Sequence, residues 1–120
     1  MKYSTMSENG NQGFVESLLA AAGAYGAENA VRTADLLSMS GISDKRALQH
    51  IIEKERVAGA VICSKCREGG GYYLPSSRDE ILDYERTLKS RAFGTLRTLR
   101  SARRALQIMD GQQQIEGQGV

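Results

Sequence analysis

Hydrophobic residues recur at the three- and four-residue spacing of helices through the first half of the chain. A first stretch, interrupted by glycines at 23 and 26, contains Phe14, Val15, Leu18, Leu19 and Ala22. This pattern predicts a helix that begins near Gly13 and buries one face. The preceding residues 1–12 lack periodic hydrophobicity and include Ser, Asn and Gly, so we expect a flexible N-terminal arm there.

A second and a third helix are predicted on either side of a tight turn. Thr33 is placed to cap the second helix, over about 34–39, after an extended link at 30–32. The turn Gly41-Ile42-Ser43-Asp44 ends in a strong capping residue, and the third helix follows from Lys45. Its apolar side comprises Ala47, Leu48, Ile51, Ile52 and the segment 55–57. The opposite, displayed side comprises Lys45, Arg46, Gln49, His50 and Glu53.

Two β-forming segments follow, at 60–63 and 72–74, and the stretch between them ends in three consecutive glycines. They predict a hairpin with a long, mobile tip. Because side chains alternate along a strand, at least one of Tyr72 and Tyr73 is expected to pack on the core. The glycines are not a nucleotide-binding loop, since no Lys-Ser/Thr pair follows them and no parallel βα unit surrounds them.

The last predicted helix runs from about Arg78 to Met109, with Ser77 as its cap and acidic residues in its first turn. Its apolar seam comprises Ile81, Tyr84, Leu88, Ala92, Leu96, Leu99, Ala102, Leu106 and Met109. At about 1.5 Å per residue the helix would be roughly 45 Å long, more than a small domain covers. Weak helix formers around Gly94 mark the place for any bend or break. The Gln- and Gly-rich residues 110–120 are expected to be disordered.

This length and pattern fit one small α+β domain, mainly α with a small β-hairpin, plus an accessory helix. The chain has 120 residues, of which 41% are hydrophobic and 25% charged, as in ordinary globular proteins. No apolar run approaches the roughly 18 residues of a membrane span, and the N-terminus lacks a hydrophobic signal core. We therefore expect a cytoplasmic protein without membrane association.

The net charge of +2 hides a strong asymmetry along the chain. Residues 1–77 contain eight Lys and Arg against eight Asp and Glu. Between 86 and 107 stand seven basic residues and no acidic one: Arg86, Lys89, Arg91, Arg97, Arg100, Arg103 and Arg104. A single-sign block of this kind attracts a polyanion, although it can also be a merely solvated face.

Candidate chemistry is sparse. Cys63 and Cys66 form a lone Cys-x-x-Cys, and the single histidine, His50, supplies at most a third zinc ligand within one chain. We therefore expect two reduced structural thiols, with no metal and no cofactor. No nucleophile with a partnering acid accompanies His50, so we expect no enzymatic activity and no small-molecule substrate.

The order helix, short strand, helix, turn, helix and hairpin is that of a winged helix-turn-helix. The segment LLSMSGISDKRALQHII resembles the helix-turn-helix of that family, and VAGAVICSKCREGGGYYLPSS resembles its two wing strands. The Gly-Tyr-Tyr-Leu-Pro wing end followed by SRAFGTLRTLRSARRAL further resembles small winged-helix proteins of phages and prophages of Gram-positive bacteria. This resemblance covers approximately residues 27–106. It implies a winged helix-turn-helix at 13–77, a basic C-terminal helix at 78–109 and binding to double-stranded DNA.

By position in this pattern, Ser43 and Lys45 would contact phosphates, while Arg46, Gln49 and His50 would reach base edges in a major groove. Lys65 and Arg67, at the wing tip, resemble basic wing residues that touch phosphates or a minor groove. The full set of expected DNA-binding residues is Thr33, Ser43, Lys45, Arg46, Gln49, His50, Lys65 and Arg67.

The leading hypothesis is a sequence-specific DNA-binding regulator of prophage transcription or replication. The alternative is a winged-helix module for protein–protein interaction, favoured by the balanced charge of residues 1–77. We also expect a homodimer, because two copies supply two half-sites. The residues expected to hold it are Leu88, Leu96, Leu99 and Leu106.

Overall fold

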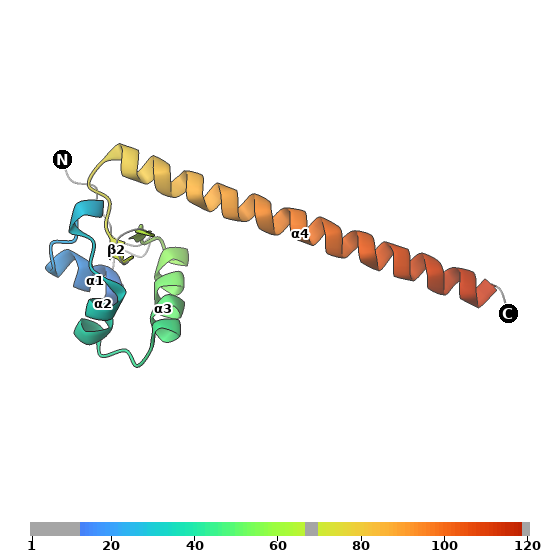
Figure 1. Ribbon diagram of the computed structural model, residues 1–120, viewed down its shortest axis with the longest axis horizontal. Coiled ribbons are helices and arrows are strands. Elements are labelled where there is room, and N and C mark those ends of the chain that lie inside the picture. Colours follow the sequence, from blue (N-terminus) through green and yellow to red (C-terminus); the bar gives the residue numbers. More distant parts are fainter. Residues whose placement is uncertain (1–12, 67–69, 119–120) are drawn as a thin grey trace. The chain divides into compact units, whose positions relative to one another are not determined.

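The structure, a computed structural model, describes residues 13–66 and 70–118. It is mainly helical, with a small two-stranded antiparallel sheet and a long C-terminal helix (Figure 1), so the expected α+β class is confirmed. The elements in chain order are α1 (Phe14–Ala21), the short 3-10 helix η1 (Ala27–Asn29), α2 (Thr33–Ser40), α3 (Lys45–Val57), β1 (Cys63–Ser64), β2 (Tyr72–Tyr73) and α4 (Arg78–Gln118). The chain divides into a first unit, Met1–Leu82, and a second unit, Asp83–Val120.

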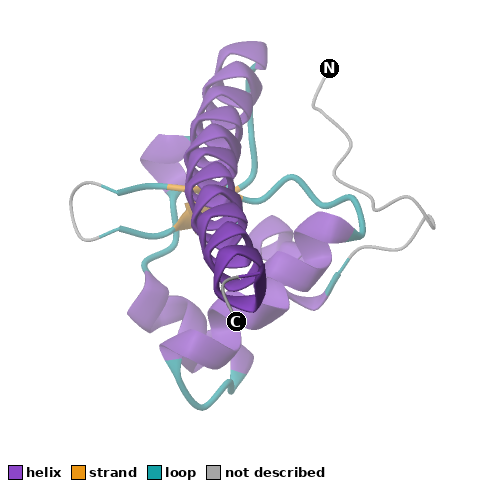
Figure 2. Cartoon of the chain, turned by 90° about the vertical axis from the view of Figure 1, so that its right-hand side faces the viewer, coloured by secondary structure: helices purple, strands orange, loops and turns teal. Residues whose placement is uncertain are grey.

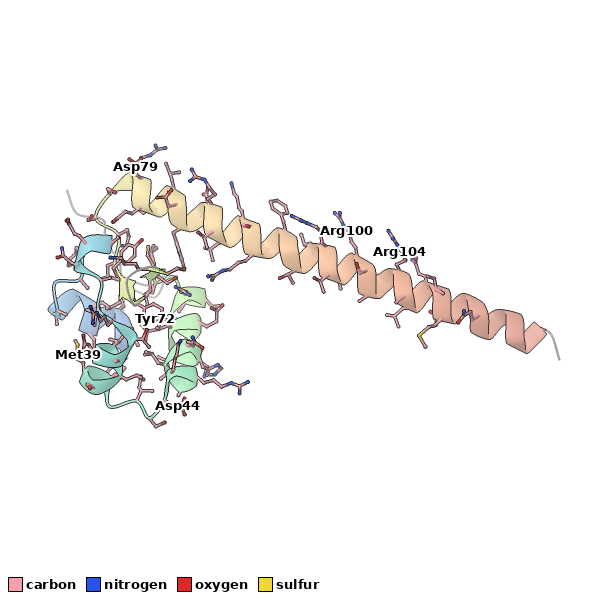
Figure 3. The ribbon with its side chains drawn as sticks, viewed as in Figure 1. Met39, Asp44, Tyr72, Asp79, Arg100 and Arg104 are labelled. Carbon is pink, nitrogen blue, oxygen red and sulfur yellow. The ribbon has the colours of Figure 1, made fainter. Side chains whose placement is uncertain are left out.

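Three helices and the hairpin enclose the hydrophobic core of the first unit. The core side chains are Val15 and Leu19 of α1, Leu36 of α2, Leu48 and Ile52 of α3, and Ile62, Tyr72 and Leu74 around the strands. Of the two tyrosines, Tyr72 is the one that packs inside, as Figure 3 shows, and Tyr73 is half-buried. The alternation expected along this strand is therefore confirmed.

The sheet is shorter than expected, but a third segment extends it. The two strands, orange in Figure 2, pair Cys63 with Tyr73 and Ser64 with Tyr72. The prediction of a strand at 60–63 is wrong for residues 60–62: the guanidinium of Arg56 donates to the Ile62 carbonyl at 2.9 and 2.6 Å. On the other side of β2, Val31 and Tyr72 exchange two backbone hydrogen bonds of 2.9 Å.

Gly71 makes this third contact possible. Its φ is +132°, and a β-carbon there would lie 2.6 Å from the carbonyl oxygen of Val31. A larger residue would push the hairpin away from the link and strain its own backbone. The glycine run predicted a mobile hairpin tip, and this prediction is wrong for Gly71, which is held against Val31. Gly69 lies outside the described residues.

A carboxylate from α3 closes the N-terminus of α1. The Glu55 side chain accepts hydrogen bonds from the backbone N–H groups of Val15 and Glu16, at 2.8 and 2.9 Å. A β-carbon at Gly13 would overlap this carboxylate, so the glycine leaves room for it. Placing Glu55 in the apolar stripe of α3 was wrong, because its carboxylate satisfies amides that a helix start leaves without partners.

The carboxylate of Glu80, in the first turn of α4, closes the N-terminus of η1. It accepts from the amide of Ala27 at 2.8 Å and from the amide and hydroxyl of Ser76 at 2.8 and 3.1 Å. Ser77 caps α4 as expected, accepting from the Glu80 amide at 3.3 Å. These contacts lie within the first unit, which includes the first turn of α4 and ends at Leu82.

Thr33 is not a cap. The helix α2 begins at Thr33 itself, Arg32 is the capping residue, and no side chain caps this end. The reason is that the Arg32 carbonyl already accepts the amide of Leu36 at 2.9 Å, which starts the helical ladder one residue early.

Within the second unit, α4 continues without a break through Gly94 and on to Gln118. The predicted disorder of residues 110–120 is therefore wrong for 110–118, and residues 119–120 lie outside the described part, as does the N-terminal arm. Extending an existing helix adds one hydrogen bond per residue, which offsets the cost of about 1 kcal/mol for a glycine such as Gly111. No helix in the described ranges is long and apolar enough to cross a membrane.

Candidate nucleic-acid interface

The turn before α3 fixes the direction in which its polar residues point. The carboxylate of Asp44 accepts from the Ala47 amide at 2.7 Å, which starts the helix as expected (Figure 3). Leu48 and Ile52 are fully buried, so the opposite side of the helix faces outward. The predicted DNA-facing residues of this segment are all exposed: Ser43, Lys45, Arg46, Gln49 and His50.

Three of these side chains share one surface feature. An open depression at the N-terminal end of α3 is lined by Asp44, Arg46, Ala47, Gln49 and His50. The three residues expected to reach bases are thus brought together over the first turns of the helix. Asp44 adds a negative charge at its edge, and the nearby positive charge comes from Lys45, Arg46 and the N-terminus of the helix.

The remaining expected residues are not brought to this depression. Thr33 is half-buried at the first position of α2. The ammonium of Lys65 donates to the carbonyl of Ala27 at 3.5 Å and is half-buried, so it is already engaged within the first unit. Arg67 lies outside the described residues. The hairpin therefore contributes less to the candidate interface than its sequence indicated.

The cysteines do not form a reactive pair. Both are free; Cys63 is buried and Cys66 is exposed. Burial raises the pKa of the Cys63 thiol to about 12, the negative charge of Glu80 adds to this increase, and Arg56 opposes it. Among the described residues no three metal-binding side chains gather in one place.

Five of the basic residues on α4 form a stripe that the apolar pattern of the sequence did not indicate. Arg86, Lys89, Arg97, Arg100 and Arg104 follow one another at offsets of 3, 8, 3 and 4 residues, which places them on one side of a helix. Figure 3 shows Arg100 and Arg104 extending from the same side. We call these five residues the basic stripe. Applying the helical periodicity used for apolar residues to the charged ones would have revealed it.

The basic stripe is only partly neutralised within the chain. Arg86 pairs with Asp83 at 3.0 Å, and Lys89 pairs with Glu85 at 3.2 Å; both pairs are exposed. Within the described residues, Arg97, Arg100 and Arg104 form no ion pair. The distal part of the stripe therefore carries positive charge that is available to a polyanion.

Comparisons with protein-family models, curated proteins and solved structures found no match.

Proposed function

We propose that the protein binds double-stranded DNA in a sequence-specific manner through a winged helix-turn-helix, with α3 as the recognition helix. The observation that carries this proposal is the outward face of α3, where Arg46, Gln49 and His50 line one open depression behind a capped turn. An exposed polar helix edge of this kind fits the major groove, where base edges present distinguishable donors and acceptors.

The order of elements supports the winged-helix assignment. The chain passes from α1 through the link at Val31 to α2, a short turn, α3 and the β1–β2 hairpin. The backbone bridge between Val31 and Tyr72 places the link beside the hairpin, which supports this assignment. The resemblance of residues 27–106 to phage and prophage winged-helix proteins favours a role in regulating phage transcription or replication.

The exposed side chains suit different parts of a DNA duplex. Arg46 can donate two hydrogen bonds to guanine, and Gln49 can bind adenine through its amide. Ser43 and Lys45, beside the positive N-terminus of α3, suit phosphate oxygens. Because the charges of residues 1–77 balance, non-specific attraction depends on the basic residues of α4.

The test begins with selection of bound fragments from random duplex DNA by the full chain. We expect an enriched sequence, and Arg46→Ala or Gln49→Ala should weaken binding to it by about 1 to 3 kcal/mol for each base contact that the substitution removes. Binding to random DNA should change much less. Lys54→Ala is the matched control, because it removes one exposed positive charge from the same helix, away from the depression.

Equal losses on selected and random DNA would contradict base reading by α3. Failure to enrich any sequence, with no affinity for duplex DNA at low salt, would overturn the proposal. That result would favour the protein-interaction alternative, in which the exposed α3 face docks another protein.

A further inference from the structure

The second unit displays an apolar seam that no other part of this unit covers. Every residue from Glu85 to Asp110 is exposed. The large apolar side chains of the seam are between 41% and 59% exposed: Leu88, Leu96, Leu99, Leu106 and Met109. Exposed apolar surface on this scale marks an interaction site, and a long helix in water gains most of its stability from packing such a face.

We propose that the seam is covered by α4 of a second copy of this chain, packed antiparallel across a two-fold axis near Thr95. Several seam positions are symmetric about this residue. Leu88 and Ala102 lie seven positions before and after Thr95, and Tyr84 and Leu106 lie eleven positions before and after it. An antiparallel two-fold pairing sets each residue against its mirror position, so one surface complements itself.

Small residues stand where the two helices cross. Ala92 and Thr95 occupy the seam near the axis, and Gly94 adjoins them. The Thr95 hydroxyl donates to the carbonyl of Arg91 at 3.0 Å, so this polar group stays satisfied when the seam is covered. Large side chains then fill the space on either side of the crossing, which is how close-packed helix pairs interdigitate.

One ion pair that could form between the copies favours the antiparallel orientation. The first turns of α4 are acidic, and the seven basic residues between 86 and 107 follow them. Because the basic stretch from Arg86 to Arg104 is centred on Thr95, both orientations place the stretches of the two copies side by side, and only individual ion pairs distinguish them. Glu85 and Arg103 are separated by 18 residues, or five full helical turns, and therefore lie on the same flank of the seam. In the antiparallel pair, this flank of one helix lies beside the same flank of the other helix. Glu85 of one chain therefore comes near Arg103 of the other chain.

A further consequence concerns the basic stripe. A two-fold axis perpendicular to both helices keeps one flank of each helix on the same side of the pair. The basic stripe is not such a flank but the side of α4 opposite the seam, because Arg86, Arg97 and Arg104 each stand two residues, about 200° around the helix, from Leu88, Leu99 and Leu106. In the pair, the stripes of the two copies therefore point outward in opposite directions. The inference does not depend on whether α3 reads DNA, since the seam and its symmetry lie within α4.

Disulfide trapping in the full chain tests the orientation. On a Cys66→Ser background, which removes the exposed native thiol, Glu85→Cys and Arg103→Cys variants are oxidised separately and as an equimolar mixture. We expect the mixture to yield a crosslinked dimer of the two different chains, and either variant alone to crosslink far less. Efficient crosslinking of each variant to itself would indicate a parallel pair and overturn the proposal.

Sedimentation of the full chain tests the interface itself. Leu99→Asp should raise the dimer dissociation constant by at least about 30-fold, because it buries a charge in the seam. Ser101→Asp introduces the same side chain on the far side of α4 and should leave dimerisation within about threefold of the wild type. A wild-type chain that stays monomeric into the high micromolar range, or equal effects of the two substitutions, would also overturn the proposal.

Discussion

Cys63 and Cys66 are three positions apart, yet their thiols lie in opposite environments. Burial keeps the pKa of Cys63 near 12, and Cys66 is exposed. Only a thiolate reacts with alkylating reagents, so Cys63 should stay inert at pH 8 while the protein is folded. We expect one thiol per chain to be modified rapidly by iodoacetamide, and two after denaturation.

The Cys66→Ser variant is the control for this assignment. It should show no rapid modification when folded and one reactive thiol when unfolded. Rapid modification of the folded variant would mean that Cys63 is accessible, which contradicts its burial.

At the scale of single residues, the sequence predicted what depends on close neighbours. Asp44 as a helix cap and the exposure of Arg46, Gln49 and His50 follow from local spacing, and the structure has both. Gly71 was misinterpreted, because the carbonyl that excludes a side chain there belongs to Val31, far away in the chain. A contact of this kind leaves no periodic signal in the sequence.

At the scale of elements, the first helix depends on a carboxylate from the third. Two amides at the start of α1 donate to the two oxygens of Glu55. Glu55→Gln replaces one accepting oxygen with a donor, so one amide loses its partner. We expect a loss of about 1 kcal/mol in the free energy of unfolding, measured by urea denaturation.

Glu53→Gln provides the matched control, because it makes the same change from carboxylate to amide at an exposed position on the same helix. It should alter the free energy of unfolding by less than about 0.5 kcal/mol. Equal effects of the two substitutions would show that the Glu55 carboxylate does not hold α1.

Glu80 gives the first unit a pH-dependent stability. Burial acts to raise the pKa of this carboxyl, but hydrogen bonds from the Ser76 and Ala27 backbones and the Ser76 hydroxyl bring it below its ordinary value of 4.5. Because the pKa of Glu80 is lower in the folded than in the unfolded state, its ionised carboxylate stabilises the fold fully above pH 4.5. This contribution to the free energy of unfolding is lost as the pH falls through the pKa of the folded state. Glu80→Gln should therefore destabilise the protein at pH 7 by about 1 kcal/mol and much less at pH 3, by urea denaturation. A penalty that is independent of pH would contradict this.

The elements themselves were largely predictable, and their ends were not. Apolar periodicity located α1, α2, α3 and the start of α4, because burial of one face dictates it. The first strand was placed too early because Arg56 binds the Ile62 carbonyl, and α4 extends past Met109 because an established helix tolerates weak formers. Both outcomes depend on groups outside the local pattern.

At the scale of the whole molecule, charge is divided between the two units. The first 77 residues are electrically balanced, and α4 carries a stretch of seven basic residues without an acidic one between 86 and 107. If the basic stripe binds phosphates, Arg100→Ala removes one phosphate interaction and should make the salt dependence of DNA binding shallower by about 0.9 log units. Lys54→Ala removes the same charge from an exposed position outside α4 and should leave the slope unchanged. Identical slopes for both variants and the wild type would make the stripe a solvated face.

The two glutamate caps also bear on how the chain is made. Glu55 serves a helix that begins some 40 residues before it, and Glu80 serves an amide 53 residues earlier. During synthesis, α1 and η1 leave the ribosome long before their caps, and proteins generally fold such units only when the last needed segment has emerged. Folding of the first unit therefore finishes late in translation, after the opening turn of α4 has left the exit tunnel, and a nascent chain stalled before residue 80 would lack the second cap.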